Sequence, residues 1–220
     1  MKYYKLFLAQ LLGALSACCI SSFSQASSVS DLFITEIMAN PSAVSDANGE
    51  WFEIFNPTSD SISLEGIFPS DDGAGNNHTF SNIGGNLLVG SGEYFVLARN
   101  DNTLTNGNFT ADYVYGSDFS LTNTDDEIVF SDTLGELLRF NYSSGFVVNG
   151  ASMELINEGT VNPIYAASTS LYGDGDLGTP GAAGTYAFSV APSPVPLPSA
   201  LWLFGSGLVG LIGFTRKRPS

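Results

Sequence analysis

Positive charge is almost missing from the interior of this 220-residue chain. Of its seven Lys and Arg residues, five lie among the first five or the last five positions. The stretch between them holds Arg99 and Arg139, and it holds all 22 acidic residues, so two bases against 22 acids leave a net charge of −20. Such a surface repels the phosphates of nucleic acids, and we expect no nucleic-acid partner. It is typical of a solvated acidic coat, or of a surface that divalent cations bridge to anionic polymers.

Cysteine and histidine are also scarce, which excludes several kinds of site. The two cysteines are Cys18 and Cys19, and the one histidine is His78. A domain that begins after them has neither a disulfide nor a thiolate metal ligand, and one histidine cannot build a multi-histidine zinc site. A Ser-His-Asp triad would have to use His78, but no serine stands in a Gly-x-Ser-x-Gly nucleophile elbow. We therefore predict no enzyme, with a carboxylate-pair glycan hydrolase as the alternative.

The amino end has the pattern of a secretory signal peptide over residues 1–26. Lys2 and Lys5 precede an apolar run at 6–17, and residues 24–26 (Ser-Gln-Ala) form a small-residue cleavage site. We therefore expect export through the Sec translocon and cleavage by signal peptidase. Two alternatives stay open: an N-terminal anchor helix, and a lipobox at residues 15–18 in which Cys18 would be lipidated.

The carboxyl end predicts a membrane helix over residues 199–214, which are free of charge. Such a run satisfies its backbone hydrogen bonds in lipid only as a helix, and the basic residues Arg216, Lys217 and Arg218 then stay on the cytoplasmic side. Sixteen residues rise about 24 Å, which is short for a hydrocarbon core of about 30 Å. This length suits a transient, single-pass anchor.

The middle of the chain has the pattern of one all-β domain, over residues 27–165. Helical signals are nearly absent, and turn residues punctuate short β-branched or aromatic runs. Tyr94, Val96 and Ala98 alternate with Phe95 and Leu97, which is typical of an antiparallel β-sandwich or barrel. A Gly/Ala/Ser/Pro-rich stretch at 166–194 is predicted to be a linker. We expect strands at 32–38, 51–56, 61–67, 78–83, 93–98, 127–131, 136–142 and 152–157.

The order of the strand motifs resembles the lamin-tail domain of secreted bacterial proteins. The motifs are ITEIMANP at 34–41, EWFEIFNP at 50–57, ISLEG at 62–66, GEYFVLA at 92–98 and DEIVF at 126–130. The resemblance extends over residues 32–157, and Gly-Thr-Pro-Gly at 178–181 is similar to the family's usual final motif. It implies an immunoglobulin-like antiparallel β-sandwich. The chain departs from the family after Gly66, where Ile67 stands in place of the usual tryptophan.

Residues 195–220 resemble the PEP-CTERM sorting signal in its Val-Pro-Leu-Pro form. The motif is Val195, Pro196, Leu197 and Pro198, followed by the apolar span and the basic cluster. The resemblance implies an exosortase-type protease as processing partner, cleavage near the motif, and transfer from the inner membrane to the cell surface or extracellular matrix of a Gram-negative bacterium. A permanent membrane anchor is the alternative.

Three acidic loops are candidate calcium sites, because clustered carboxylate oxygens are the ligands that hard cations take. None of them completes an EF-hand pattern, and the alternative is that these acids bond to the backbone of their own turns. No other cofactor is expected. The candidate ligands are Asp71, Asp72, Asp125, Asp126, Asp174 and Asp176.

The sequence thus predicts an exported, non-catalytic structural or binding module of the cell surface or exopolysaccharide matrix. Its partner would be a polysaccharide or a protein, and a line of exposed aromatic residues such as Trp51, Phe68 or Tyr172 would favour sugar stacking. The alternatives are the glycan hydrolase and a permanently anchored, calcium-dependent adhesion protein.

Overall fold

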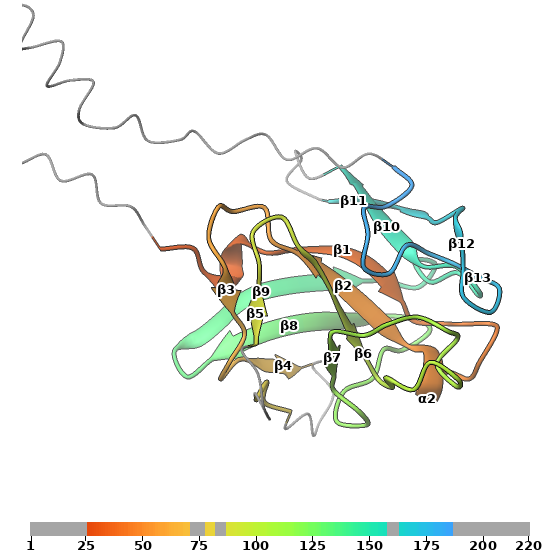
Figure 1. The fold of residues 1–220 in the computed structure, drawn as a ribbon, viewed down its shortest axis with the longest axis horizontal. Coiled ribbons are helices and arrows are strands. Elements are labelled where there is room, and N and C mark those ends of the chain that lie inside the picture. The colour runs from red at the N-terminus through yellow and green to blue at the C-terminus, as the bar shows by residue number, and fades with distance from the viewer. Residues whose placement is uncertain (1–25, 71–77, 82–86, 158–162, 187–220) are drawn as a thin grey trace, which may run out of the picture. The chain divides into compact units, whose positions relative to one another are not determined.

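The computed structural model describes residues 26–70, 78–81, 87–157 and 163–186, and these are almost entirely strands and turns (Figure 1). The signal peptide, the sorting signal and Asp71 and Asp72 lie outside the described residues. The helices are one 3-10 turn, η1 (Val29–Asp31), and one α-turn, α2 (Asp46–Gly49). In this part of the chain, neither helix has the length and apolar character that a membrane span requires. The strands are β1 (Phe33–Met38), β2 (Trp51–Phe55), β3 (Ile62–Ser63), β4 (Phe68–Ser70), β5 (Leu88–Val89), β6 (Tyr94–Ala98), β7 (Tyr113–Val114), β8 (Asp126–Asp132), β9 (Gly135–Tyr142), β10 (Met153–Asn157), β11 (Ile164–Ala167), β12 (Leu171–Tyr172) and β13 (Asp176–Leu177).

Two sheets form the sandwich. The large sheet has the order β11-β10-β1-β2-β6-β7, and its neighbours are antiparallel except for the parallel pair β6 and β7. The small sheet has the order β4-β8-β9 and is antiparallel throughout. The strand β11 is therefore one edge of the large sheet, and β9 is one edge of the small sheet. This arrangement confirms the predicted all-β, immunoglobulin-like sandwich.

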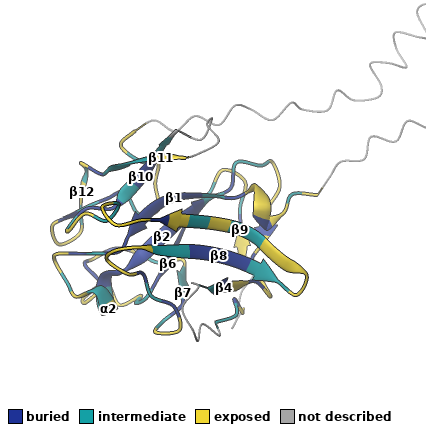
Figure 2. Ribbon diagram, turned by 180° about the vertical axis from the view of Figure 1, so that it is seen from behind, coloured by how far each residue is buried: buried dark blue, intermediate teal, exposed yellow. Residues whose placement is uncertain are grey.

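The main core lies between the two sheets and follows the alternation of the strands. Phe95 and Leu97 of β6 enter this core together with Phe52 of β2. The ring of Phe52 reaches Phe130 of the small sheet, with centroids 6.1 Å apart. Figure 2 shows the middle of β8 buried, whereas β9 is largely exposed or half-buried. The predicted division of 93–98 into two faces is therefore confirmed.

The opposite face of the large sheet is buried as well, by a second apolar cluster. Met38, Trp51 and Val96 lie in it, each at 0 % exposure, with Phe109 from a loop and Tyr172 from β12 packed against them. The Trp51 indole N–H donates to the Tyr172 hydroxyl at 3.0 Å. Both faces of the central strands are thus covered, and the cover on the outer face comes partly from residues after 165.

The prediction that 166–194 is a linker is wrong for residues 166–186. The strand β11 pairs with β10, and β12 pairs with β13. Small residues are needed here for close packing: a Cβ on Gly178 would lie 2.9 Å from the Glu36 carboxylate, and a Cβ on Gly184 would lie 2.8 Å from that of Glu154. The composition that suggested a linker allows this segment to lie directly on the sheet.

Other differences concern short strands. The predicted strand at 61–67 divides into β3 and a turn that precedes β4. The part of the predicted strand at 78–83 that the structure describes, residues 78–81, is not a strand, although the backbones of Phe80 and Ile67 bond at 2.8 Å. The strands β5, β7, β12 and β13 were not predicted. Each has two residues, which are too few to show the alternation of apolar and polar positions that indicates a strand.

Candidate functional site

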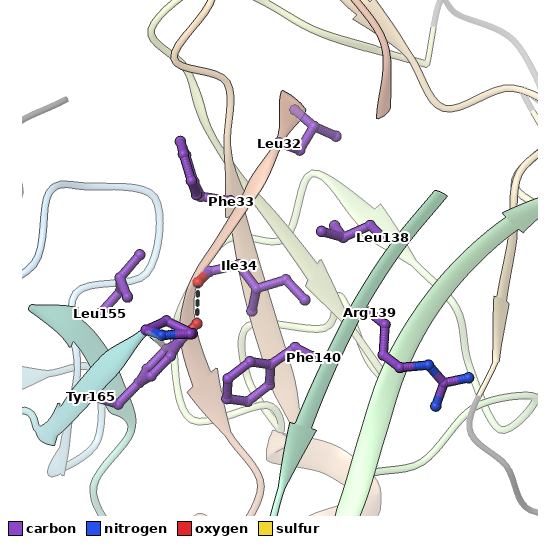
Figure 3. Close-up of a pocket in the computed structure, with 9 residues that line it drawn as sticks. Leu32, Phe33, Ile34, Leu138, Arg139, Phe140, Leu155 and Tyr165 are labelled. Atoms are coloured by element: carbon purple, nitrogen blue, oxygen red, sulfur yellow. Dashed lines mark hydrogen bonds between the residues drawn. The ribbon is translucent and has the colours of Figure 1, made fainter. Parts of the chain in front are cut away.

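An open groove, which we call the edge groove, lies where the free edges of the two sheets approach each other. It consists of two adjoining cavities of about 150 and 430 Å³. Phe140 of β9 and Tyr165 of β11 belong to both cavities, and their ring centroids are 4.7 Å apart. Figure 3 shows the smaller cavity, which is mainly apolar. The lining residues of the edge groove are Leu32, Phe33, Ile34, Leu138, Arg139, Phe140, Asn141, Tyr142, Ser143, Phe146, Leu155, Pro163 and Tyr165.

Four aromatic rings form a continuous wall in the larger cavity. Phe146 lies 5.6 Å from Phe140, 5.2 Å from Tyr142 and 5.5 Å from Tyr165, measured between ring centroids. The two tyrosines are fixed by their hydroxyls: Tyr142 donates to the Thr122 carbonyl at 2.8 Å and Tyr165 to the Ile34 carbonyl at 2.5 Å. Burial raises the pKa of both hydroxyls, so they stay protonated at neutral pH. The wall is therefore a rigid apolar surface.

Polar residues belong to the rim of the larger cavity beside this wall. Arg139, Asn141 and Ser143 are all exposed. Arg139 pairs with Glu136 at 2.8 Å, and Figure 3 shows its guanidinium pointing away from the smaller cavity. An exposed ion pair of this kind contributes little to stability, so the guanidinium can exchange Glu136 for an anionic ligand at small cost. The edge groove can therefore stack against a ring and bond to hydroxyl or carboxylate groups.

A second polar constellation, the glutamate row, lies on the outer face of the large sheet. Glu154 of β10, Glu36 of β1 and Glu53 of β2 are register partners on three neighbouring strands. Each of them is 1 % exposed. Burying a carboxylate costs free energy unless hydrogen bonds compensate for its lost hydration. The burial of these three glutamates therefore depends on the hydrogen-bond donors around them.

The donors come largely from residues 178–186, which we call the closing segment. The Glu36 carboxylate accepts the Thr179 N–H at 2.8 Å, the Thr179 hydroxyl at 2.7 Å, and the hydroxyl of Ser152. The Glu53 carboxylate accepts the Gly181 N–H at 2.8 Å. The Glu154 carboxylate accepts the Thr185 N–H at 2.6 Å and the Thr185 hydroxyl at 3.1 Å. The closing segment is thus held on the central strands by carboxylates.

Burial shifts the titration of two members of the row. It raises the pKa of Glu36 from 4.5 to about 7 and that of Glu53 from 4.5 to about 8, against the opposing effect of their hydrogen bonds. The neighbouring carboxylates add to both shifts, since Glu154 acts on Glu36 and Glu36 acts on Glu53. Among the described residues, no lysine or arginine is a main cause of either shift. Glu36 and Glu53 therefore change their protonation close to neutral pH.

The sequence did not identify the glutamate row, although a signal was present. Glu36 and Met38 share a strand face, as do Glu53 and Trp51, so each charge lies on an otherwise apolar face. The edge groove was missed because Tyr165 and Pro163 fall at the end of the predicted domain, where no strand was expected.

Where the structure describes the predicted calcium ligands, Asp126 and Asp176 accept hydrogen bonds from backbone N–H groups. Asp176 is buried and accepts the Ser42 and Ala43 N–H groups at 3.0 and 3.1 Å. Asp126 accepts the Thr122 N–H at 2.7 Å, whereas Asp125 contributes its carbonyl to the Thr122 hydroxyl at 2.8 Å. Asp174 is exposed. Within the described ranges, no three His, Cys, Asp or Glu side chains gather as a metal-binding group.

The other candidate residues are dispersed. Trp51 is fully buried, Tyr172 is half-buried against it, and Phe68 is exposed on β4, so these three do not form a line for sugar stacking. His78 is half-buried and lies 2.7 Å from the Tyr113 hydroxyl and 3.3 Å from the Asp118 carboxylate. It has aromatic and acidic neighbours instead of a serine nucleophile.

Comparison with family models gives two matches. The model of the Lamin Tail Domain matches residues 25–145, more than half of the chain, and that of the PEP-CTERM protein-sorting motif matches residues 194–218. No curated protein and no solved structure matches the chain. The first match includes β1 to β9 but stops before the closing segment. By these matches the chain belongs to the Lamin Tail Domain family and carries a PEP-CTERM motif, which marks it for export and for exosortase-dependent sorting to the cell surface.

Proposed function

We propose that this protein is a non-catalytic binding module of the cell surface or exopolysaccharide matrix, and that the edge groove is its ligand site. The observation that carries this proposal is the chemistry of the groove lining: the described residues that line it offer aromatic rings and neutral or cationic polar groups, and none of them is Asp, Glu or His. Such a lining can bind a ligand, but it offers no general acid or base.

The alternative, a glycan hydrolase, needs two carboxylates that reach the substrate. The glutamate row has neighbouring carboxylates with raised pKa values, which is a feature of some hydrolase sites. However, the closing segment covers this row, and every carboxylate in it already bonds to main-chain N–H and hydroxyl groups. These contacts fit a structural role, and a non-catalytic role also fits the lamin-tail fold.

The ligand that suits the edge groove is a saccharide unit that carries a carboxylate. A sugar ring presents an apolar face that packs on aromatic rings, and its hydroxyls would face Asn141 and Ser143. Arg139 supplies the positive charge that such a unit requires, at one place on a stretch whose net charge of −20 otherwise repels anionic polymers. Arg99 is occupied in a partly buried pair with Glu50 at 2.9 Å. A cavity of about 430 Å³ falls within the usual size of ligand pockets.

Retardation in gels containing polygalacturonate or dextran tests this function. The wild-type protein should be retarded by polygalacturonate and much less by dextran. Phe146→Ala removes one ring of the wall and should weaken retardation at least about fivefold, whereas Phe68→Ala, an exposed phenylalanine outside the groove, should leave it unchanged. Equal retardation of wild type and Phe146→Ala, or none by either polymer, would contradict the proposal.

The route to the surface is proposed from the sorting motif. The chain would be held in the inner membrane by residues 199–214, with its carboxyl end cytoplasmic, and cut near residues 195–198. Replacing Pro196 and Pro198 by alanine should trap it in the inner membrane fraction. Normal release of that variant would count against exosortase cleavage at this motif and would leave the binding function of the groove untouched.

A further inference from the structure

We propose that the closing segment is a proton-controlled latch: it docks on the glutamate row when Glu36 and Glu53 are protonated and is released as they ionise. The inference does not depend on the edge groove, and it concerns residues after the matched lamin-tail region. Its basis is the way in which each carboxylate of the row is bound.

The three glutamates share one bonding scheme. One carboxylate oxygen accepts a main-chain N–H of the closing segment, which can only donate: Thr179 for Glu36, Gly181 for Glu53 and Thr185 for Glu154. The other oxygen faces a threonine hydroxyl, which can either donate or accept. That hydroxyl belongs to Thr179 for Glu36, to Thr35 for Glu53 and to Thr185 for Glu154.

This scheme provides a place for a proton on every member of the row. A protonated carboxyl can donate to the threonine hydroxyl, which turns to accept, while its other oxygen still accepts the main-chain N–H. The docked segment therefore tolerates neutral carboxyls without losing a hydrogen bond. Three ionised carboxylates on neighbouring strands would instead repel one another in a region shielded from water.

Among the residues that the structure describes, no cation lies where it would offset this repulsion. Tyr94 and Tyr172 face the row, and burial raises the pKa of both hydroxyls, so both are neutral in the physiological range. Asp176 lies near Tyr172 and adds negative charge. The two described arginines pair elsewhere, Arg99 with Glu50 and Arg139 with Glu136.

The direction of the response follows from linkage. When the segment is docked, Glu36 titrates at about 7 and Glu53 at about 8, whereas carboxyls freed into water titrate near 4.5. The docked state thus holds more protons. Its advantage is complete below about pH 4.5 and is lost as the pH rises through about 7 to 8.

The latch would set the length of the tether before the sorting motif. Residues 187–193 separate the docked segment from the matched motif at 194, which is about 25 Å of fully extended chain. Release of residues 178–186 would add nine residues, or roughly 30 Å. Before the proposed cut near residues 195–198, a change in pH would therefore change how far the sandwich can stand from the anchor at residues 199–214.

Amide hydrogen exchange of the wild-type protein at pH 5.5 and 8.5, corrected for intrinsic rates, tests the latch. At pH 8.5 the Thr179, Gly181 and Thr185 amides should be at least about tenfold less protected than core amides such as those of Phe52 and Leu97, and this difference should be much smaller at pH 5.5, because release opens the segment without unfolding the sandwich. Equal changes in both sets would show global destabilisation instead, and unchanged protection of the segment would show that its docking is independent of protons. Either result overturns the proposal.

Two variants sharpen the measurement. Glu53→Gln, which mimics the protonated carboxyl, should keep the Gly181 amide protected at pH 8.5 and reduce its pH dependence by at least about threefold. The control Glu65→Gln changes an exposed glutamate outside the row and should behave as wild type. If Glu53→Gln kept the full pH dependence of wild type, the row would not be the proton-binding element.

Discussion

The glutamate row and the edge groove are two groups of side chains outside the main core, and they differ in polarity and in exposure. The row is polar and closed: three carboxylates at 1 % exposure are covered by the closing segment, which also supplies most of their hydrogen-bond donors. The groove is aromatic and open, with Phe146 and Tyr165 only half-buried. A polar group can be buried at low cost only when it has hydrogen-bond partners, so we assign the row a role in stabilising the domain and in controlling the closing segment. The groove is open and is therefore available to a ligand.

The largest effect that separates the two regions is expected from Glu36→Ala. The substitution leaves the Thr179 N–H, the Thr179 hydroxyl and the Ser152 hydroxyl without their acceptor. The free energy of unfolding at pH 6 should fall by about 2–4 kcal/mol, measured by urea denaturation.

The matched control is Glu36→Gln, which keeps acceptor oxygen and shape and should cost less than about 1 kcal/mol under the same conditions. Equal losses in the two variants would mean that the bonds to the closing segment do not stabilise the domain. Both variants should keep wild-type retardation in polygalacturonate, because the row lies outside the groove.

Close packing of the closing segment can be tested at Gly178. A Cβ there would lie 2.9 Å from the Glu36 carboxylate, 3.0 Å from the Tyr172 ring and 3.1 Å from the Ser152 hydroxyl. Gly178→Ala should therefore lower the free energy of unfolding by about 1–3 kcal/mol. Ala183→Val adds bulk at an exposed position of the same segment and should stay within about 0.5 kcal/mol of wild type. A neutral Gly178→Ala would show that the segment does not lie tightly on the sheet.

In the groove, Arg139 and its partner Glu136 should act with opposite signs. Arg139→Gln should reduce retardation by polygalacturonate by about threefold at low salt and leave any weak binding to dextran unchanged. Glu136→Gln releases Arg139 from its ion pair and removes a negative charge, so retardation should be equal or stronger. Loss of binding in both variants would indicate a change in loop structure instead of recognition of charge.

The smallest effect is expected from calcium. Asp126 and Asp176 already bond to backbone N–H groups, which leaves fewer oxygens for a cation. Addition of 5 mM calcium, about the millimolar level at which weak extracellular sites bind, should raise the melting temperature by less than about 2 °C. A rise of several degrees that Asp71→Asn and Asp72→Asn abolish would instead reveal a site at these two residues, and calcium-dependent adhesion would gain support.

Local patterns predicted most of the sandwich, and contacts distant in sequence account for what they missed. The alternation at 93–98 and the order of the strand motifs indicated the fold and the family, because strand period and turn residues are local properties. The glutamate row depends on contacts such as that between Glu36 and Thr179, which are 143 residues apart. The closing segment looked like a linker because small residues serve close packing and flexibility equally well. The edge groove was not predicted because it lies between β9 and β11, and no strand was expected at the position of β11.

The most direct test of the glutamate row is the pH dependence of the free energy of unfolding. It is measured by urea denaturation at pH 5.5 and 8.5 on wild type and on the double variant Glu36→Gln/Glu53→Gln. Burial raises the pKa of Glu36, Glu50 and Glu53 in the folded domain, so wild type should lose at least about 2 kcal/mol as the pH rises. The double variant should lose clearly less and keep only the part that Glu50 contributes. The same loss in both proteins, or a wild-type domain that gains stability towards pH 8.5, would contradict the role assigned to the glutamate row.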